Sequence, residues 1–488
     1  MPKYIFFVSL RQIIIIIPMK ENIIGRKKEK ELLSDIFHSK KSEFIAVCGR
    51  RRVGKTYLIK EFFADDLVFQ TSGIARANMP QQIKSFYTDM KDQGLTTMAS
   101  PPKDWIEVFS MLKKLITASL NERKVILLDE LPWMDTPRSG FVGALEHFWN
   151  SWVSGRNDII LVVCGSATSW MMDNLINSHG GLHNRITHHI FLEPFTLGES
   201  EQYLEWKGIH LSRYEIAECY MILGGIPYYL DLLSPRLSLT QNIDELLFSK
   251  TGGLHNEFSN LYAALFKHSD NYIKVVKTLC IKRHGLTRQE IIEHTDIPSG
   301  KGLTTILKNL EYCGFIYSAT QYKGDHHNKT LYQLVDFFTL FHYRFIEGKK
   351  TQWSAVHGTP AYFAWAGLTF ETLVFNHIRE VKRKLGISGV ITKAFPWRSN
   401  DPQGGAQIDL VIDRTDQTIN LCEIKYSLAP FIISKEYENN LRNKYAQFVN
   451  YTQSKKSIQI TFITSYGVVR GKHSGIVSNE VVLDDLFE

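Results

Sequence analysis

Apolar runs with polar ends divide the N-terminal part of the chain into predicted strands. The runs are residues 44–48, 125–128 and 159–164. Unbroken apolar stretches of this length are typical of strands buried on both faces of a parallel sheet. Ahead of them, apolar residues from Leu32 to Phe37 lie on one face of a helix predicted at 28–38. The pattern therefore predicts an α/β fold with a parallel sheet between layers of helices.

The first apolar run leads directly into a glycine-rich loop and then into a helix predicted at 57–63. The loop and the first helical residue are Gly49, Arg50, Arg51, Arg52, Val53, Gly54, Lys55, Thr56 and Tyr57. The glycines allow successive backbone N–H groups to converge on an anion, and the helix N-terminus adds partial positive charge. In such a loop, Lys55 reaches the β- and γ-phosphates and the Thr56 hydroxyl binds Mg²⁺. The strand–loop–helix context therefore predicts a triphosphate site.

The next two apolar runs place candidate catalytic residues at the same edge of the sheet. Asp129 and Glu130 end the second run, where Asp129 would complete the magnesium shell and Glu130 would polarise the attacking water. Ser166 follows the third run, and its hydroxyl could reach the γ-phosphate or the water. Equally, Ser166 or Thr168 could cap the next helix. Arg185 precedes a further strand, where it could reach the nucleotide of a neighbouring subunit or could be a solvated surface arginine.

These residues resemble the P-loop ATPases of the AAA+ and STAND classes, and more narrowly the archaeal-type ATPase family. The resemblance also covers residues 24–29, residues 192–195 and the stretch at 224–230, which begins Gly-Gly-Ile-Pro. It implies that ATP is the nucleotide, that Gly25 and Arg26 lie beside it, and that Pro227 packs on the adenine from a helical lid. A plain turn between helices is the alternative for the proline stretch. No second-sensor arginine is evident in the sequence, which favours a nucleotide-dependent switch over a processive ring motor.

From residue 270 the pattern changes to three short helices followed by a β-hairpin. Thr287 and Glu290 have the spacing of a capping box at the start of the second helix. The third helix is predicted at 299–312, and strands are predicted at 314–317 and 330–334. Three helices and a hairpin in this order resemble a winged helix.

In a winged helix, the third helix would enter a DNA major groove. Its polar face here carries Lys301, Thr304, Thr305 and Lys308, and the hairpin tip at 323–329 could contact phosphates. Basic residues only modestly outnumber acidic ones between 270 and 350. The alternative is a module that packs against the ATPase core without contacting DNA.

A strand–turn–strand pattern at 407–412 and 420–425 brings three polar residues of the C-terminal part together. Asp409 lies on the first strand, and Glu423 and Lys425 share one face of the second, because side chains alternate along a strand. Two carboxylates can hold Mg²⁺ through oxygen ligands, and the lysine can orient water and stabilise developing charge. Glu371, on a helix predicted at 367–378, would add a third carboxylate.

This arrangement resembles the PD-(D/E)xK nuclease fold of restriction enzymes and Holliday-junction resolvases, with Ile408 where the pattern has proline. The resemblance implies an α/β restriction-endonuclease-like domain that acts on DNA and has Mg²⁺ at Glu371, Asp409 and Glu423. Further along, Lys435, Arg442 and Lys444 could contact a phosphate backbone. A hairpin with a surface Glu–Lys pair is the structural alternative.

Composition sets the broad class of the protein. The chain has 488 residues, of which 44% are hydrophobic and 22% charged, and these are ordinary values for a globular protein of about three domains. The net charge of +7 permits an anionic partner without requiring one. None of the six cysteines forms a Cys-x-x-Cys pair, which argues against a zinc ribbon or a disulfide scaffold and favours a reducing cytoplasm.

Residues 4–17 are almost entirely apolar but too short to span a bilayer, and they have no small-residue cleavage site. We expect an N-terminal extension with translation starting at Met19, and a weak membrane anchor is the alternative.

Together the patterns predict an extension at 1–20, a P-loop ATPase core at 21–195, a helical lid at 196–268, a winged helix at 269–350 and a nuclease-like domain at 359–488. The predicted function is ATP binding and hydrolysis by a cytoplasmic AAA+/STAND-type switch that controls DNA binding and Mg²⁺-dependent DNA cleavage. The alternative is a non-cleaving switch that binds a protein partner. A homo-oligomer is a further expectation, because Arg185 could act between subunits.

Overall fold

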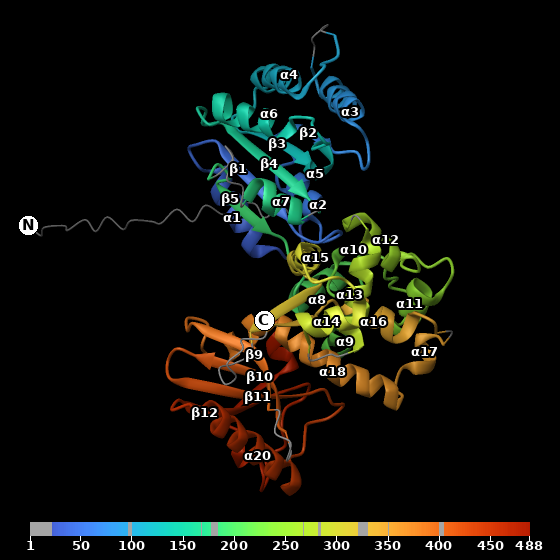
Figure 1. Cartoon of the computed structure of the whole chain (residues 1–488), viewed down its shortest axis with the longest axis vertical. Helices are drawn as coiled ribbons and strands as arrows, with labels where there is room; N and C mark the ends of the chain where they lie inside the picture. Colours follow the sequence, from blue (N-terminus) through green and yellow to red (C-terminus); the bar gives the residue numbers. More distant parts are fainter. Residues whose placement is uncertain are drawn as a thin grey trace, which may run out of the picture.

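The computed structural model describes residues 22–95, 100–166, 168–176, 184–266, 268–281, 285–320, 330–349, 351–399 and 405–488. The predicted N-terminal extension and the hairpin tip at 323–329 lie outside these residues. Figure 1 shows three bodies in a row, namely an N-terminal α/β part, a helical middle part and a C-terminal part built on a sheet.

A five-stranded parallel sheet forms the centre of the N-terminal part. Its strands are β1 (Glu43–Cys48), β2 (Leu67–Ser72), β3 (Lys124–Asp129), β4 (Ile159–Gly165) and β5 (His188–Phe191). Their order is β2-β3-β4-β1-β5, which confirms the predicted α/β fold with a parallel sheet. The edge strand β2 is absent from the prediction, because Gln70 and Thr71 interrupt its short apolar run.

Helices cover both faces of this sheet (Figure 1). They are α1 (Lys27–Phe37), α2 (Lys55–Phe62), α3 (Met79–Asp92), α4 (Trp105–Ala118), α5 (Leu131–Met134), α6 (Phe141–Phe148) and α7 (Thr168–Met171), with π-helical turns η1 (Trp149–Val153) and η2 (Met172–Ile176). Side chains alternate along β1, so that Ile45 packs in one apolar layer with Leu58 of α2, and Phe44 packs in the other with Trp149. The layer that contains Ile45 continues into the lid and the C-terminal helices.

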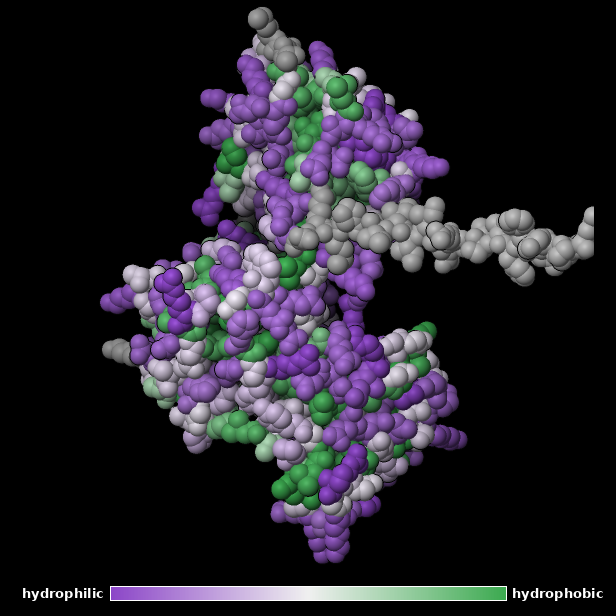
Figure 2. Space-filling view, turned by 180° about the vertical axis from the view of Figure 1, so that it is seen from behind, coloured by the Kyte–Doolittle hydropathy of each residue, from purple (hydrophilic) through white to green (hydrophobic). Residues whose placement is uncertain are grey.

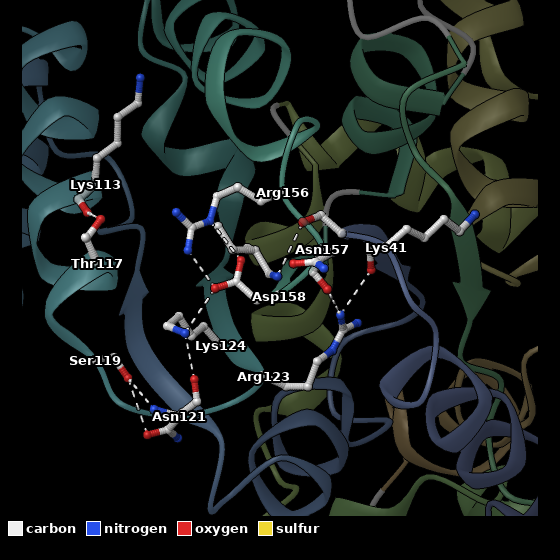
Figure 3. A network of polar contacts seen from close by, with 12 residues as sticks. Lys41, Lys113, Thr117, Ser119, Asn121, Arg123, Lys124, Arg156, Asn157 and Asp158 are labelled. Atoms are coloured by element: carbon white, nitrogen blue, oxygen red, sulfur yellow. Dashed lines mark hydrogen bonds and ion pairs between the residues drawn. The ribbon is translucent and has the colours of Figure 1, made fainter.

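Polar contacts fasten the N-terminal ends of β1, β3 and β4 (Figure 3). The buried Arg123 guanidinium donates to the backbone oxygens of Lys41 at 3.1 Å and Asn157 at 2.5 Å. Asp158 accepts hydrogen bonds from Lys124 at 3.0 Å and Arg156 at 2.6 Å. The hydrogen bond from Arg156 lowers the pKa of Asp158 to about 2. These contacts serve the fold, because they lie at the sheet edge opposite the strand ends that carry Gly49 and Asp129.

The middle part begins with the predicted lid. Its helices are α8 (Leu197–Trp206), α9 (Arg213–Leu223), α10 (Pro227–Asp231), α11 (Leu239–Ile243) and α12 (Glu257–Leu265), with the π-helical turn η3 (Asp244–Phe248). A tight turn at Gly224 and Gly225 separates α9 from α10. At Gly225 φ is 64°, and a Cβ atom there would lie 2.5 Å from the Phe195 carbonyl oxygen, so no larger residue fits.

Three helices and a small sheet follow the lid in the predicted order. The elements are α13 (Ser269–Ile281), β6 (Leu286–Thr287), α14 (Arg288–Thr295), α15 (Lys301–Tyr312), β7 (Ile316–Thr320), β8 (Thr330–Leu334), α16 (Phe337–Phe341) and the π-helical turn η4 (His342–Ile346). The predicted capping box is confirmed, since Glu290 N donates to Thr287 Oγ1 and Thr287 N donates to Glu290 Oε2. Strand β6, which the sequence did not indicate, adds a third antiparallel strand beside β8.

The C-terminal part is a five-stranded mixed sheet between helices. Its elements are α17 (Trp353–Val356), α18 (Pro360–Asn376), α19 (Ile378–Lys384), β9 (Thr392–Arg398), β10 (Gln407–Arg414), β11 (Thr418–Lys425), α20 (Lys435–Thr452), β12 (Ser457–Thr464), β13 (Asn479–Val482) and the 3₁₀ turns η5 (Ser474–Ile476) and η6 (Leu483–Leu486). The strand order is β13-β12-β11-β10-β9. Strands β9 to β11 are antiparallel, whereas β11 to β13 are parallel. One face packs against Phe448 of α20, and the other packs against Phe370 of α18.

Among the described residues, every helix is too short or too polar to cross a membrane. Figure 2 shows mostly polar side chains on the face that it presents, with apolar residues in scattered patches.

Candidate nucleotide site and C-terminal carboxylate site

The glycine-rich loop joins β1 to α2 with the geometry that its spacing predicts. Gly49 has φ of 145°, and a Cβ atom at this position would lie 2.4 Å from the Leu192 carbonyl oxygen. Gly54 has φ of 92° and directly precedes α2. The buried Lys55 ammonium donates to the carbonyl oxygens of Gly49 and Arg50, at 2.9 Å each. Burial lowers the pKa of Lys55, and the carboxylates of Glu130 and Asp129 oppose this shift.

Thr56 and Asp129 meet beside the loop. Thr56 Oγ1 donates a 2.7 Å hydrogen bond to Asp129 Oδ2, which joins the first turn of α2 to the end of β3. A hydroxyl and a carboxylate side by side are the oxygen donors that Mg²⁺ prefers, so these residues fit the predicted ion. Glu130 follows Asp129 with φ of 45°, an unusual backbone conformation for a residue with a side chain.

Ser166 lies beside Glu130, as expected for strand ends that share one sheet edge. Its hydroxyl donates to Glu130 Oε2 at 2.9 Å, and its backbone N–H points to the same oxygen at 3.3 Å. The contact holds the Glu130 carboxylate at the start of α7. Thr168 begins α7, but its side chain lies outside the described residues.

The Arg26 side chain contacts backbone oxygens of the protein itself. Its buried guanidinium donates to the carbonyl oxygens of Glu193 at 2.8 Å and Val53 at 3.0 Å, and it stacks on the Phe195 ring at 4.6 Å. Gly25 and Arg26 both have positive φ, and the Arg26 N–H donates to Glu199 at 2.7 Å. Arg26 therefore fastens the loop to the end of β5 through backbone oxygens, which leaves it fewer donors for a nucleotide.

Two loop arginines reach toward the middle part, a feature that the sequence did not reveal. Arg50 forms a buried ion pair with Asp336, whose side chain also caps α16, and stacks on Phe315 at 4.7 Å. The Asp336 carboxylate outweighs burial and raises the pKa of Arg50 above its usual value. Both residues line a cavity of about 280 Å³ between the core, the middle part and α18.

Arg52 makes the second link between the loop and the middle part. Its guanidinium lies 2.8 Å from Glu257 of α12 and 4.1 Å from the Tyr228 ring centroid. Pro227 starts α10 next to Tyr228 and is half-buried.

Tyr57, at the start of α2, makes a contact within the N-terminal part. Its hydroxyl donates to the Asn22 carbonyl oxygen at 2.9 Å.

Arg185 is exposed in the turn before β5, and Arg51 is partly exposed in the loop. The position of Arg185 leaves both of its predicted interpretations open.

In the C-terminal part, β10 and β11 form the predicted hairpin. The antiparallel register runs from Asp413 opposite Ile419 to Leu410 opposite Cys422, so Asp409 and Glu423 follow at the open end. Asp409 Oδ2 accepts a 2.9 Å hydrogen bond from the Ile424 N–H. Burial and then the Glu423 charge raise the pKa of Asp409. Two adjacent carboxylates of this kind supply oxygen donors suited to a divalent cation.

The Glu423 carboxylate is buried and is contacted by three donor groups. Lys425 Nζ lies 2.9 Å from Oε1, and the Tyr437 hydroxyl donates to the same oxygen. Lys444 Nζ lies 2.7 Å from Oε2. Burial alone would raise the pKa of Glu423, but the Lys425 and Lys444 ammonium groups lower it. The sequence indicated Lys444 only as a phosphate contact and gave no sign of Tyr437, because both residues reach Glu423 from α20.

Glu371 does not join this cluster. It lies on the side of α18 that faces α13 and β8, where it lines a small cavity with Leu279, Gln333 and Leu340. Within the described part of the chain, no three His, Cys, Asp or Glu side chains gather as a metal site. The predicted third carboxylate is therefore wrong, because Phe370 takes the α18 position that faces the sheet beside Tyr426.

The predicted DNA-reading helix α15 contacts the N-terminal part. Lys308 lies 2.8 Å from Asp173 of η2, and α15 packs beside α7. Lys301, Thr304 and Thr305 are exposed on the same helix. One of the four predicted polar contacts is thus paired with the core.

Comparison with known proteins bears on the N-terminal part. Residues 24–233 match the model of a family described as an ATPase domain predominantly from Archaea. These residues therefore resemble that ATPase domain, and they include the glycine-rich loop and Asp129. A relative, the uncharacterized protein MJECL04 of Methanocaldococcus jannaschii, is 23% identical over 416 residues, which cover 83% of this chain and 87% of the relative.

Solved structures that are similar to this chain include those of two further proteins. A Walker-type ATPase of Pyrococcus abyssi is 18% identical with a TM-score of 0.46, covering 67% of this chain and 97% of the other. The ORC2 protein of Aeropyrum pernix is 14% identical with a TM-score of 0.42, covering 73% of this chain and 97% of the other. The matched family region ends at residue 233, before the carboxylate site. The family match therefore gives no information on that site, and its chemistry is inferred from the positions of its residues.

Proposed function

We propose that the protein is an ATP-binding and hydrolysing switch whose nucleotide state controls a DNA-binding C-terminal domain with Mg²⁺-dependent cleavage activity. Thr56 and Asp129 would hold Mg²⁺, Lys55 would bind the β- and γ-phosphates, and Glu130 would orient the attacking water. Ser166 would position Glu130 through their 2.9 Å hydrogen bond. When bound, Mg²⁺ would neutralise charge on the transferred phosphoryl group.

The observation that carries this proposal is that the lid touches both sites. At one end, Arg52 of the phosphate loop pairs with Glu257 at 2.8 Å. At the other end, Tyr214 of α9 stacks on Tyr426, with ring centroids 4.7 Å apart. Tyr426 directly follows Lys425, so a lid movement that responds to the γ-phosphate would reach the carboxylate site through one packed body.

At the C-terminal site, Asp409 and Glu423 would hold Mg²⁺ beside a DNA phosphate. Lys425 would stabilise charge that develops on that phosphate, and it would orient the attacking water. The metal supplies Lewis-acid polarisation of the phosphate when it is bound. Two features of the fold support the proposal. Strands β10 and β11 are neighbours in the sheet, and their hairpin carries Asp409, Glu423 and Lys425.

A cleavage assay with single-stranded, duplex and branched DNA tests this function, with Mg²⁺ or Mn²⁺ and with or without ATP. We expect wild-type protein to cut at least one substrate, at a rate that changes when ATP is added. We expect Lys55→Ala to lose the effect of ATP and Lys425→Ala to lose cutting. Absence of cutting under every condition would refute the nuclease assignment.

A second function, a non-cleaving switch that binds a protein partner, is favoured by the occupied oxygens of Glu423. Salt dependence separates the two functions. DNA binding weakens steeply between low and physiological salt because counterions are released, whereas docking through aromatic surfaces does not.

A further inference from the structure

The carboxylate site contains a cation that a two-carboxylate metal site does not need. Lys425 lies on β11 beside Glu423, but Lys444 reaches Glu423 Oε2 from α20, at 2.7 Å. The Glu423 side chain is 5% exposed, and that of Lys444 is 19% exposed. Lys444 thus lies between a buried carboxylate and the solvent side of the site.

The net charge of the carboxylate site depends on Lys444. Asp409 and Glu423 contribute two negative charges, and Lys425 and Lys444 contribute two positive charges, so the ionised cluster is neutral. Removing Lys444 would leave one net negative charge, which favours a divalent cation. Each partner of a buried carboxylate offsets part of the cost of burying its charge, and Lys444 is the partner at Oε2, whereas Lys425 and Tyr437 contact Oε1.

We propose that Lys444 is a displaceable counter-ion, which competes with the divalent cation for Glu423 and transfers to the DNA phosphate when both ligands bind. This inference rests on the proposed nuclease function. A lysine suits the role because its ammonium is a compact point charge on a flexible stem, with donors that can turn to a new acceptor. Helix α20 fixes its backbone while the side chain moves.

The exchange links metal binding to DNA binding. A phosphate that accepts Lys444 releases Glu423 Oε2, so metal and DNA bind more tightly together than separately. By linkage, each ligand raises the affinity of the other by the same factor. The site would then remain neutral and bind free metal only weakly until a phosphodiester arrives.

Titration of the full-length protein with MnCl₂ tests the exchange, with free Mn²⁺ measured by electron paramagnetic resonance. All variants carry Asp129→Asn, so that the phosphate loop contributes no Mn²⁺ site. We expect Lys444→Met to bind Mn²⁺ about tenfold more tightly than this parent. Lys444→Arg should keep the weak parental affinity. Lys455→Met removes an exposed charge just beyond α20 and should leave Mn²⁺ affinity unchanged.

Adding a phosphorothioate DNA duplex that resists cleavage provides a second readout. It should raise Mn²⁺ affinity in the parent and have no such effect in Lys444→Met. If Lys444→Met unfolds, Lys444→Gln removes the charge while keeping a donor and should show the same tighter binding.

The outcomes separate the inference from the function on which it rests. If Asp409→Asn removes no Mn²⁺ site from the parent, both the metal-dependent function and the counter-ion role are overturned. If an Asp409-dependent site exists but Lys444→Met binds Mn²⁺ with parental or weaker affinity, the counter-ion role alone is wrong.

Discussion

The two candidate sites hold their lysines in opposite ways. Lys55 donates to two backbone carbonyl oxygens of its own loop, at 2.9 Å each, so its charge is kept for an anionic ligand. Lys425 and Lys444 both bind the carboxylate of Glu423. The lysine of the first site is therefore not paired with a carboxylate, whereas both lysines of the second site already contact one; under our proposal, the second site exchanges a cation before it binds metal. A lysine beside carboxylates therefore does not by itself indicate a site that is ready for catalysis.

Replacing Lys55 with alanine should produce the largest effect and tests the first half of this contrast. Loss of the ammonium removes the group that stabilises the transferred phosphoryl charge, and ATP turnover should fall about 1,000-fold. Phosphate release under saturating ATP measures the rate. Lys60→Ala is the matched control, because Lys60 is exposed on the same helix. Turnover at the wild-type rate in Lys55→Ala would remove the basis of the nucleotide site.

Replacing Asp409 with alanine tests the other side of the comparison, the C-terminal carboxylate site. Cleavage should fall to the background of the assay, because one of the two carboxylate ligands is lost. ATP turnover without DNA should stay close to wild type, since Asp409 belongs to the C-terminal hairpin. Asp416→Ala, in the exposed turn of the same hairpin, is the control. A variant that still cuts DNA would show that the metal site lies elsewhere.

A third substitution sharpens the contrast by asking what anchors the phosphate loop. Arg50 and Asp336 are 7% and 1% exposed, so Asp336→Asn would leave a buried guanidinium without its partner. We expect a loss of about 3 kcal/mol of stability, which lowers the midpoint of thermal unfolding. The asparagine side chain can still cap α16.

The double variant Arg50→Met, Asp336→Asn should recover much of this loss, because it removes the unpaired charge. Arg51→Met, in the same loop but partly exposed, should have little effect. Equal unfolding midpoints for Asp336→Asn and the wild type would show that the pair contributes no stability.

Residues adjacent in sequence were predictable, and partners from distant segments were not. The glycine spacing, the Asp129–Glu130 pair and the capping box at Thr287 all depend on short local patterns, which fix geometry within one loop or turn. Arg50 pairs with Asp336, which is 286 residues away in the sequence, and Lys444 contacts Glu423 from a different secondary-structure element. No local periodicity encodes those distances, because tertiary packing decides them.

The error at Glu371 has the same origin. An acid in the apolar stripe of a helix can face either of two neighbouring layers, and the sequence does not say which. In the structure, Phe370 faces the sheet and Glu371 faces the middle part. Adjacent positions on α18 point in different directions, so a shift of one residue decides whether a side chain faces the carboxylate site or the middle part.

The smallest expected effect concerns Lys308, whose ion pair with Asp173 links the middle part to the ATPase core. The two side chains are 44% and 53% exposed, so the pair should contribute less than about 1 kcal/mol to stability. Lys308→Gln should leave the unfolding midpoint nearly unchanged, as should Lys277→Gln, which breaks another exposed pair in the middle part. Thermal unfolding therefore cannot reveal the function of Lys308.

Salt-dependent DNA binding can reveal that function. If α15 lies against DNA, Lys308 must leave Asp173 and bind a phosphate, so Lys308→Gln should reduce the slope of log affinity against log salt by about one. Asp173→Asn should instead strengthen DNA binding slightly, because it releases α15 from the core without removing a phosphate contact. Lys277→Gln should leave the slope unchanged. If all three variants have the wild-type slope and affinity, α15 serves only to dock the middle part on the ATPase core, and the DNA contacts must come from the C-terminal part.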